Sequence, residues 1–174
     1  MIRTILHYPD KRLRNVGQPL TVAQIKSPEI QKLVDDMAET MYAAPGVGLA
    51  ATQIGEAYQL FIVDCADEDE PSDLRVFINP VILERHDEIT WTEGCLSFPG
   101  VNEDVDRAAR VKAKAFDRDG KEFTIEADGL LAVAIQHELD HLNGVLMIDH
   151  LGALKKRIVD RKMKKRAEAQ SSAD

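Results

Sequence analysis

One segment, from Asp128 to Gly144, restricts the possible folds more than any other part of the chain. Its apolar residues recur with the spacing that places side chains along one side of an α-helix. They are Leu130, Leu131, Ala134, Ile135 and Leu142. Asp128 can cap the start of this helix, and a glycine such as Gly144 commonly follows a helix end. The apolar stripe predicts a buried helix, so the rest of the chain has to be arranged around it.

The segments on either side of this helix predict strands and further helices. Ser27 followed by Pro28 is typical of a helix start, and apolar residues at helical spacing continue up to Pro45. Short runs rich in β-branched and aromatic residues predict strands at 58–64, 75–82, 110–116 and 121–127. The last two are joined by Asp-Arg-Asp-Gly, which predicts a hairpin turn.

A final helix is expected at about 152–169, followed by a polar frayed end at 171–174. The order of elements predicts an α+β fold. We expect short antiparallel and mixed strands around the buried helix that bears the H-E-x-x-H pattern, with a C-terminal helix beside them.

Length and composition agree with one globular domain. The chain has 174 residues, of which 44% are hydrophobic and 30% charged, so we expect a single domain over 1–174. The longest apolar run, 130–135, is far shorter than the ~20 residues of a membrane span, so no membrane partner is expected. Cys65 suits a small buried position in a strand. Two cysteines and no secretory signal predict a cytoplasmic protein.

The charge is distributed unevenly along the chain. The segment Lys155–Arg166 holds eight basic residues against Asp160 alone, a net charge of +7. Because the total is -8, the remainder of the chain carries -15. An acidic body disfavours binding to DNA, whereas the basic C-terminal helix is free to bind an acidic partner.

Two histidines, His137 and His141, lie one helical turn apart within His-Glu-Leu-Asp-His on the predicted buried helix. This spacing places both side chains on one face, where they can bind a single metal ion. Glu138 lies beside them as a potential base for a water activated by the metal. The five-residue pattern also arises by chance on helix surfaces, so the interpretation depends on a third ligand.

The third ligand has several candidates. One class of metalloproteases continues the pattern to a third histidine, but Met147 stands at that position. Asp149 and His150 lie close by, with no spacing rule to support them. Cys95, within Glu-Gly-Cys-Leu-Ser, is the better candidate because a thiolate is a strong ligand for a soft or borderline metal.

A third segment, Gly46 to Gln53, reads Gly-Val-Gly-Leu-Ala-Ala-Thr-Gln. Two nearby glycines alone usually mark a turn, and no phosphate-binding pattern follows them. Their small size nevertheless allows a substrate backbone to lie alongside, and Gln53 offers amide donors at the far end of the segment.

These segments together resemble the peptide deformylase family, whose members carry G-x-G-x-A-A-x-Q, E-G-C-x-S and Q-H-E-x-x-H. The chain matches these motifs in the same order at 46–53, 93–97 and 136–141. The resemblance continues through 117–120 and 126–131, so it covers nearly the whole chain.

The resemblance implies a metal-dependent hydrolase that removes the N-formyl group from the formyl-methionine of newly made polypeptides and releases formate. Cys95, His137 and His141 would bind one Fe(II), with nickel or cobalt as active substitutes and zinc usually poorer. Glu138 would take a proton from the attacking water and pass it to the departing amine. The oxyanion would be held by the metal, the Gln53 amide and the Leu96 backbone N–H.

The family also implies further binding positions. Gln136 would support the metal ligands, and Gly48 would pair through its backbone with the substrate peptide. The ring of His137 would line an apolar pocket for the methionine side chain. The other predicted pocket residues are Val47, Trp91, Leu130, Val133 and Ala134.

Two parts of the chain bear on specificity and partners. Some members of the family carry an arginine that touches the substrate shortly after E-G-C-x-S, where this chain has Asn102, Glu103 and Asp104. The preference beyond methionine is therefore open, and Arg107 is expected to be structural. The C-terminal helix of similar bacterial deformylases docks on the ribosome, so Lys155–Arg166 is a candidate site for ribosomal RNA.

Two other interpretations use the same residues. A zinc endopeptidase built on H-E-x-x-H would cleave internal peptide bonds and take a third ligand other than Cys95. In the second interpretation, the three ligands form a structural metal site. Such sites usually have four protein ligands, and this interpretation would leave Glu138 and Gln53 without a role.

Overall fold

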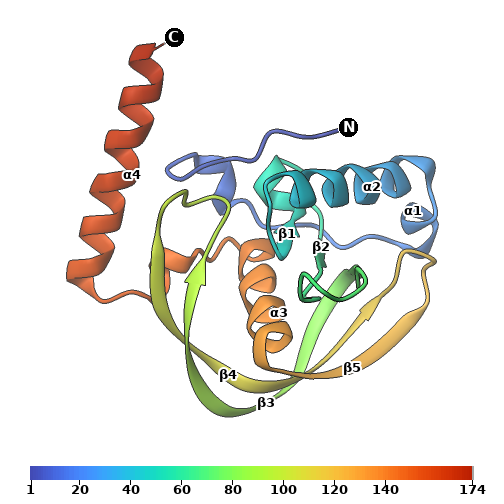
Figure 1. Ribbon diagram of the computed structural model, residues 1–174. Coiled ribbons are helices and arrows are strands. Elements are labelled where there is room, and N and C mark those ends of the chain that lie inside the picture. Colours follow the sequence, from blue (N-terminus) through green and yellow to red (C-terminus); the bar gives the residue numbers. More distant parts are fainter. Residues whose placement is uncertain (174) are drawn as a thin grey trace.

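One antiparallel sheet curves around a central helix, α3 (Gly129–Leu142), as Figure 1 shows. The computed structural model describes residues 1–173. Its sheet has the order β1-β2-β3-β4-β5, so each strand pairs with its neighbour in sequence. The strands are β1 (Gly48–Ala50), β2 (Leu60–Val63), β3 (Arg75–Gly94), β4 (Asn102–Phe116) and β5 (Glu122–Asp128).

Helices and short helical turns surround the sheet. The longer ones besides α3 are α2 (Pro28–Ala43) and α4 (Ala153–Ala173). Shorter elements are η1 (Lys11–Arg14), α1 (Val22–Ile25), η2 (Ala51–Ile54) and η3 (Met147–His150). The predicted α+β class is confirmed, with α3 packed against β1, β2, β4 and β5.

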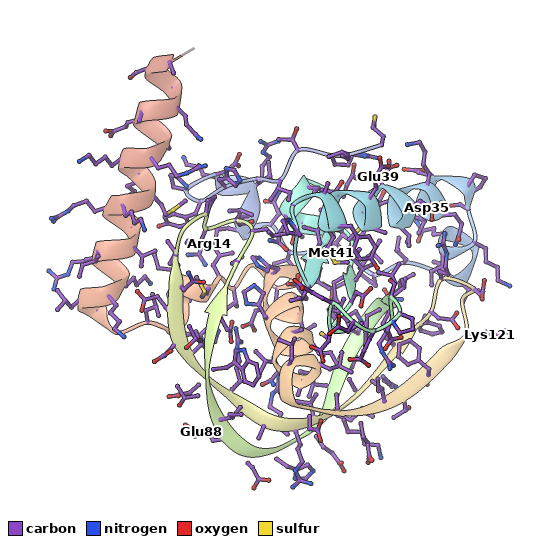
Figure 2. All side chains as sticks on the ribbon, in the orientation of Figure 1. Arg14, Asp35, Glu39, Met41, Glu88 and Lys121 are labelled. Carbon is purple, nitrogen blue, oxygen red and sulfur yellow. The ribbon has the colours of Figure 1, made fainter. Side chains whose placement is uncertain are left out.

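Helix α2 forms as its sequence predicts and covers β1 and β2. The Ser27 hydroxyl accepts a hydrogen bond from the Ile30 N–H at 3.3 Å, and Pro28 occupies the first turn. Met41 is fully buried on the inner side of the helix, whereas Asp35 and Glu39 are exposed (Figure 2). The buried face of α2 therefore covers the core formed with β1 and β2.

Helix α3 is buried, as its apolar stripe predicts, and it ends at Leu142, two residues before Gly144. The φ of +74° at Gly144 lies in the left-handed region, and a Cβ there would meet the Arg14 carbonyl oxygen at 2.6 Å. Only glycine suits this position. The prediction for Asp128 is wrong in one respect: it holds the N-cap position, but its side chain accepts no capping hydrogen bond.

The hairpin of β3 and β4 is much longer than the sequence predicts. The predicted strand at 75–82 is only the start of β3, and the strand at 110–116 is only the end of β4. The added residues pair continuously from Glu88↔Ala108 to Gly94↔Asn102, yet many of their side chains are exposed. Burial alternates along this part, but two of its buried residues, Glu93 and Arg107, are charged, so no alternating apolar pattern marks it.

The other predicted strands form with small differences. The β4–β5 hairpin is confirmed, and its turn is closed by the Asp117 N–H donating to the Lys121 carbonyl at 2.9 Å. All strand pairs are antiparallel, and the one parallel pairing among residues 1–173 is an isolated bridge between Gln18 and Tyr58. The expected mixed pairing is thus confined to that bridge. Cys65 is half-buried just beyond β2 rather than within a strand.

Helix α4 stands at one side of the molecule and starts close to the predicted position (Figure 1). It continues through 171–173, which were expected to fray, and Asp174 lies outside the described residues. Only Val159 and Met163 of this helix are buried, and Figure 2 shows many of its side chains extending into solvent. No helix among residues 1–173 is long and apolar enough to span a membrane.

Candidate active site

A cavity of about 700 Å³ opens beside the N-terminal half of α3. All three motif segments contribute to its wall, although they are far apart in the sequence. The predicted pocket residues Val47, Gly48, Trp91, Leu130, Val133 and Ala134 all line it. So do Gln53, Cys95, Leu96, His137 and Glu138.

Three potential metal ligands converge at this cavity. Cys95, His137 and His141 each offer one ligand atom, and these atoms all lie within 4.8 Å of one another. The Cys95 Sγ lies 3.3 Å from the His141 Nε2. Both histidines come from α3, one turn apart, and Cys95 directly follows β3. A thiolate and two imidazoles at this spacing are a donor set that suits a borderline divalent metal.

The alternative third ligands lie elsewhere. Met147 is buried in the core that packs against α4. Asp149 accepts a hydrogen bond from the Arg14 guanidinium at 3.0 Å, and His150 lies 2.8 Å from the Asp140 carboxylate. Among residues 1–173, the group of potential ligand atoms that includes both histidines contains none of these three, so Cys95 is the residue that the fold brings to the pair.

Glu93 fixes the orientation of His137. A Glu93 carboxylate oxygen lies 2.8 Å from the His137 Nδ1, so the other ring nitrogen, Nε2, faces the cavity. Arg107 donates to both oxygens of the same carboxylate, at 2.7 and 2.9 Å. Burial raises the pKa of Glu93, but Arg107 and His137 outweigh it and hold this pKa at about 2. Glu93 therefore stays ionised beside the ligand.

The surroundings of the two histidines differ. Burial lowers the pKa of His141 well below its usual value, which favours the neutral imidazole that binds metals. Burial also lowers the pKa of His137, but the adjacent Cys95 and Glu93 outweigh it and raise that pKa well above normal. The surroundings of His137 thus favour a positive charge on its ring, which a bound metal ion would supply in place of the proton.

Glu138 lies next to the ligands with one oxygen available. Its Oε1 is 3.8 Å from the His137 Nε2, while its buried Oε2 has no hydrogen-bond partner among the described residues. Burial raises the pKa of Glu138 to about 7. A Cβ at Gly48 would lie 2.9 Å from the Glu138 Oε1, so only glycine leaves room for this carboxylate. A buried carboxylate with a pKa near neutrality is suited to accept and return a proton.

Gln53 is held with its amide nitrogen toward Cys95. The Ala50 N–H donates to the Gln53 Oε1 at 2.9 Å, which leaves the Nε2 to donate to the Ser97 hydroxyl at 3.0 Å. The Nε2 also lies 3.7 Å from the Cys95 Sγ. The Leu96 N–H donates to no group among residues 1–173. Two N–H donors thus border the cavity near the ligand cluster.

Gln136, which was expected to support the metal ligands, bonds none of the three candidate ligands. Gln136 instead joins α3 to β4, because its amide accepts from the Ala108 N–H and donates to the Ala108 carbonyl, both at 2.9 Å. The residue that touches a ligand is Glu93, inside the E-G-C-x-S segment. Metal-binding histidines commonly pair with a carboxylate, but no spacing rule shows which one. The cavity wall also includes His7 and Gly100, which no motif marks.

The site therefore combines a candidate Cys-His-His metal centre with a neighbouring glutamate, an arrangement typical of metallohydrolases. Comparison with known proteins then identifies its family. The family model described as polypeptide deformylase matches residues 2–157. The chain is 52% identical over 162 residues to a peptide deformylase of Chromobacterium violaceum, covering 93% of this chain and 94% of that protein. The chain belongs to the polypeptide deformylase family, and the predicted family and enzyme class are confirmed.

Solved structures give the same result for the fold. A peptide deformylase from Legionella pneumophila superposes with a TM-score of 0.89 at 44% identity, covering 98% of both chains. A class I type b peptide deformylase from Acinetobacter baumannii, described as Met-Ala-Ser bound, has a TM-score of 0.82 at 30% identity. It covers 87% of this chain, which in turn covers 99% of that protein.

Proposed function

We propose that the protein removes the formyl group from the N-terminal formyl-methionine of newly made polypeptides and releases formate. The observation that carries this proposal is the buried, unpartnered Glu138 oxygen beside the Cys95, His137 and His141 cluster, within a cavity large enough for a peptide end. Three protein ligands leave one coordination position open for water or substrate. This distinguishes a catalytic metal centre from a structural one, in which four protein ligands occupy every position.

Cys95, His137 and His141 would hold the metal, and the donor types support Fe(II), nickel, cobalt or zinc. The choice of Fe(II), one per chain, rests on the family resemblance. When bound, the metal supplies Lewis-acid chemistry that makes the attacking water more acidic and the formyl carbonyl more electrophilic.

Glu138 performs the proton transfers in this proposal. Its Oε2 takes a proton from the attacking water, and the carboxylic acid then gives that proton to the amine as the C–N bond breaks. Formate and a free methionine amino group are the products. The pKa of about 7 supports both halves of this cycle, because the group can be ionised before the attack and protonated after it.

Gln53 and Leu96 would stabilise the oxyanion that forms on the formyl oxygen. The Gln53 amide is preset by the Ala50 N–H and needs little reorganisation to donate. Losing one such donor typically costs about 3 kcal/mol of transition-state stabilisation. Gly48 would offer its backbone to the substrate peptide at the edge of β1.

The methionine side chain would occupy the apolar part of the cavity beside α3. Trp91 enters this part from β3, while Leu130, Val133 and Ala134 enter from α3. Val47, which is 46% exposed, lies toward the opening. Apolar walls of this kind suit an unbranched, flexible side chain such as methionine.

The test is a direct assay of products. The protein is purified without oxygen, loaded with Fe(II) or nickel, and given formyl-Met-Ala-Ser beside a matched peptide that offers only internal bonds. We expect formate from the first and no cleavage of the second. Internal cleavage without formate would support the zinc endopeptidase interpretation instead.

The variant E138Q separates metal binding from proton transfer. It should keep its metal, since Glu138 is not one of the three ligands, and lose about 10²- to 10⁴-fold in kcat. Near-native turnover with a full metal content would remove Glu138 from the role of base. The conservative change preserves the size of the side chain and so tests the charge alone.

We further propose that the outer side of α4 docks on the ribosome, close to where formylated chains emerge. Arg157, Arg161 and Lys165, here named the outer cations, line a surface hollow to which only α4 contributes. Among residues 1–173 no carboxylate lies within 4.0 Å of these three groups. Unpaired cations on a solvated helix suit RNA phosphates. Two free cysteines, Cys65 and Cys95, suit the reducing cytoplasm in which ribosomes work.

Co-sedimentation with ribosomes tests this second proposal. Replacing the outer cations by glutamine should weaken binding, and binding by the unaltered protein should fall as salt rises. Unchanged co-sedimentation of the triple variant would contradict docking through this surface.

A further inference from the structure

The cations of α4 fall into two sets that face different surroundings. The outer cations face solvent, as described above. Lys162 and Arg166, here named the inner cations, face the body instead. The Lys162 Nζ donates to the Gly100 carbonyl at 3.0 Å, and the Arg166 Nη1 lies 3.3 Å from the His7 Nδ1.

The partners of the inner cations belong to the active-site cavity. Both Gly100 and His7 line it, together with the neighbouring Pro99. The inner cations therefore lie directly behind one rim of the cavity, separated from its interior by a single layer of residues. A peptide that leaves the cavity across this rim would pass within reach of both charges.

The inner cations have no opposite charge paired with them. Among residues 1–173, no carboxylate forms a salt bridge with Lys162 or Arg166, whereas Lys155 and Lys164 have carboxylate neighbours at 3.6 and 3.0 Å. Burial and the Arg166 charge lower the pKa of His7. A neutral His7 ring accepts an N–H of Arg166 without adding a charge of its own. The rim is therefore positively charged where it meets α4.

We propose that the inner cations recognise acidic side chains in the formylated polypeptide after its third residue. The inference rests on the proposed function, because it concerns the same substrate. A tripeptide, Met-Ala-Ser, is bound in a related deformylase structure, so the residues after the third are those left to cross the rim. The family model ends at residue 157, so the inner cations lie in a part of this chain that it does not describe.

Acidic side chains of β4 lie outside the cavity wall. Asp104 and Asp106 are exposed, and Thr92, which lines the cavity, and Thr90 donate to them, each at 2.6 Å. A peptide that left along β4 would favour basic residues. We place the exit at α4 because the inner cations have only uncharged acceptors, and an acidic side chain would supply their first opposite charge.

The experiment compares three formylated pentapeptides that share formyl-Met-Ala-Ser and differ at positions four and five. These positions hold Asp-Asp, Asn-Asn or Lys-Lys, and formate release gives kcat/KM for each at low and at high salt. We expect the Asp-Asp peptide to exceed the Lys-Lys peptide by roughly fivefold or more at low salt, mainly through KM. The ratio should approach one at high salt, because the charges are exposed to solvent.

Two double variants assign the effect to its residues. In K162Q/R166Q the ratio of the Asp-Asp to the Lys-Lys peptide should fall toward one at low salt. In the matched control R161Q/K165Q, which removes the same number of charges from the outer side of α4, the ratio should stay at its original value. Because each ratio is measured within one protein, a general loss of activity does not affect it.

The outcomes separate this inference from the proposed function. Formate from the Asn-Asn peptide establishes deformylation whatever the charged peptides do. Equal rates for all three peptides at low salt would overturn the inference alone, as would a ratio that K162Q/R166Q leaves unchanged. Preference for the Lys-Lys peptide would also overturn it and would place the exit along β4.

Discussion

Helices α3 and α4 use their charged residues in opposite ways. On α3 the functional side chains are buried, and Glu93 and Arg107 hold His137 from the neighbouring strands. On α4 only Val159 and Met163 are buried, and most of the cations point into solvent. A buried side chain is held in one orientation, which suits a reaction at one particular bond. An exposed charged side chain stays free to bind larger and more variable partners.

The largest expected effect comes from removing the Cys95 sulfur, which lies beside the two histidines of α3. C95A should lose more than about 100-fold in metal affinity, since changes even to the partners of ligands cost 10- to 100-fold. Metal content after gel filtration, measured beside formate release, checks this. C65A is the control because Cys65 lies outside the ligand cluster. Tight metal binding by C95A would instead favour the endopeptidase interpretation.

The next largest expected effect comes from breaking the buried ion pair between Arg107 and Glu93. Arg107 and Glu93 are each only 4% exposed, and R107M removes the guanidinium that pairs with both Glu93 and Asp140. The buried Glu93 would keep only its contact with His137, so the free energy of unfolding should fall by about 3–5 kcal/mol. Arg110 on the same strand pairs with Asp87, but their side chains are 60% and 67% exposed. R110M should therefore cost less than about 1 kcal/mol. Urea unfolding of both variants at equal metal loading measures the contrast, and equal losses would contradict it.

A smaller effect concerns how α4 is held. The Tyr8 hydroxyl donates to Asp160 of α4, and burial together with this bond raises the pKa of Tyr8 to about 12. An unfolded tyrosine titrates near about 10. Because the folded pKa is the higher one, the contact contributes fully below about pH 10 and is lost as the pH approaches 12.

The measurement is the difference in Tm between the unaltered protein and Y8F across alkaline pH. This difference should be constant up to about pH 10 and then shrink, because Y8F has no hydroxyl to titrate. A difference that stays constant over the whole range would show that the hydroxyl adds nothing to the docking of α4.

The smallest expected effect comes from replacing exposed cations of α4. R161Q/K165Q should change the free energy of unfolding by no more than about 0.5 kcal/mol, as is usual for surface positions without structural contacts. Thermal unfolding monitored by circular dichroism is sufficient to check this. A loss of several kcal/mol would mean that the outer cations hold α4 in place and are not free for a partner.

The fold was predictable where burial imposes a periodic pattern. Helices α2 and α3 and the β4–β5 hairpin follow directly from apolar spacing, caps and turn residues. The outer half of the β3–β4 hairpin was missed because one face is exposed and the other buries the charged residues Glu93 and Arg107 beside Val105. Its strands are specified by each other, and a pairing between segments leaves no periodic mark on either one.

The same division applies to the site. The short motifs at 46–53, 93–97 and 136–141 name the residues of the cavity, because chemistry restricts the residue types at each position. The sequence signals for the partners of those residues are weaker. Glu93 is only the first residue of the E-G-C-x-S motif, and nothing in the sequence favours it over Gln136 as the residue that supports His137. The choice between them depends on which carboxylate the curvature of β3 brings to His137.

By itself, the sequence determined the α+β class, the buried helix with its two histidines, the family resemblance and the uneven charge of the chain. These follow from local spacing and residue type, which a linear chain already contains. Only the tertiary structure decided that Glu93 and Arg107 orient His137, and that Lys162 and Arg166 lie behind the rim of the cavity. Such contacts join residues far apart in the chain, so they depend on how the sheet bends and where α4 packs.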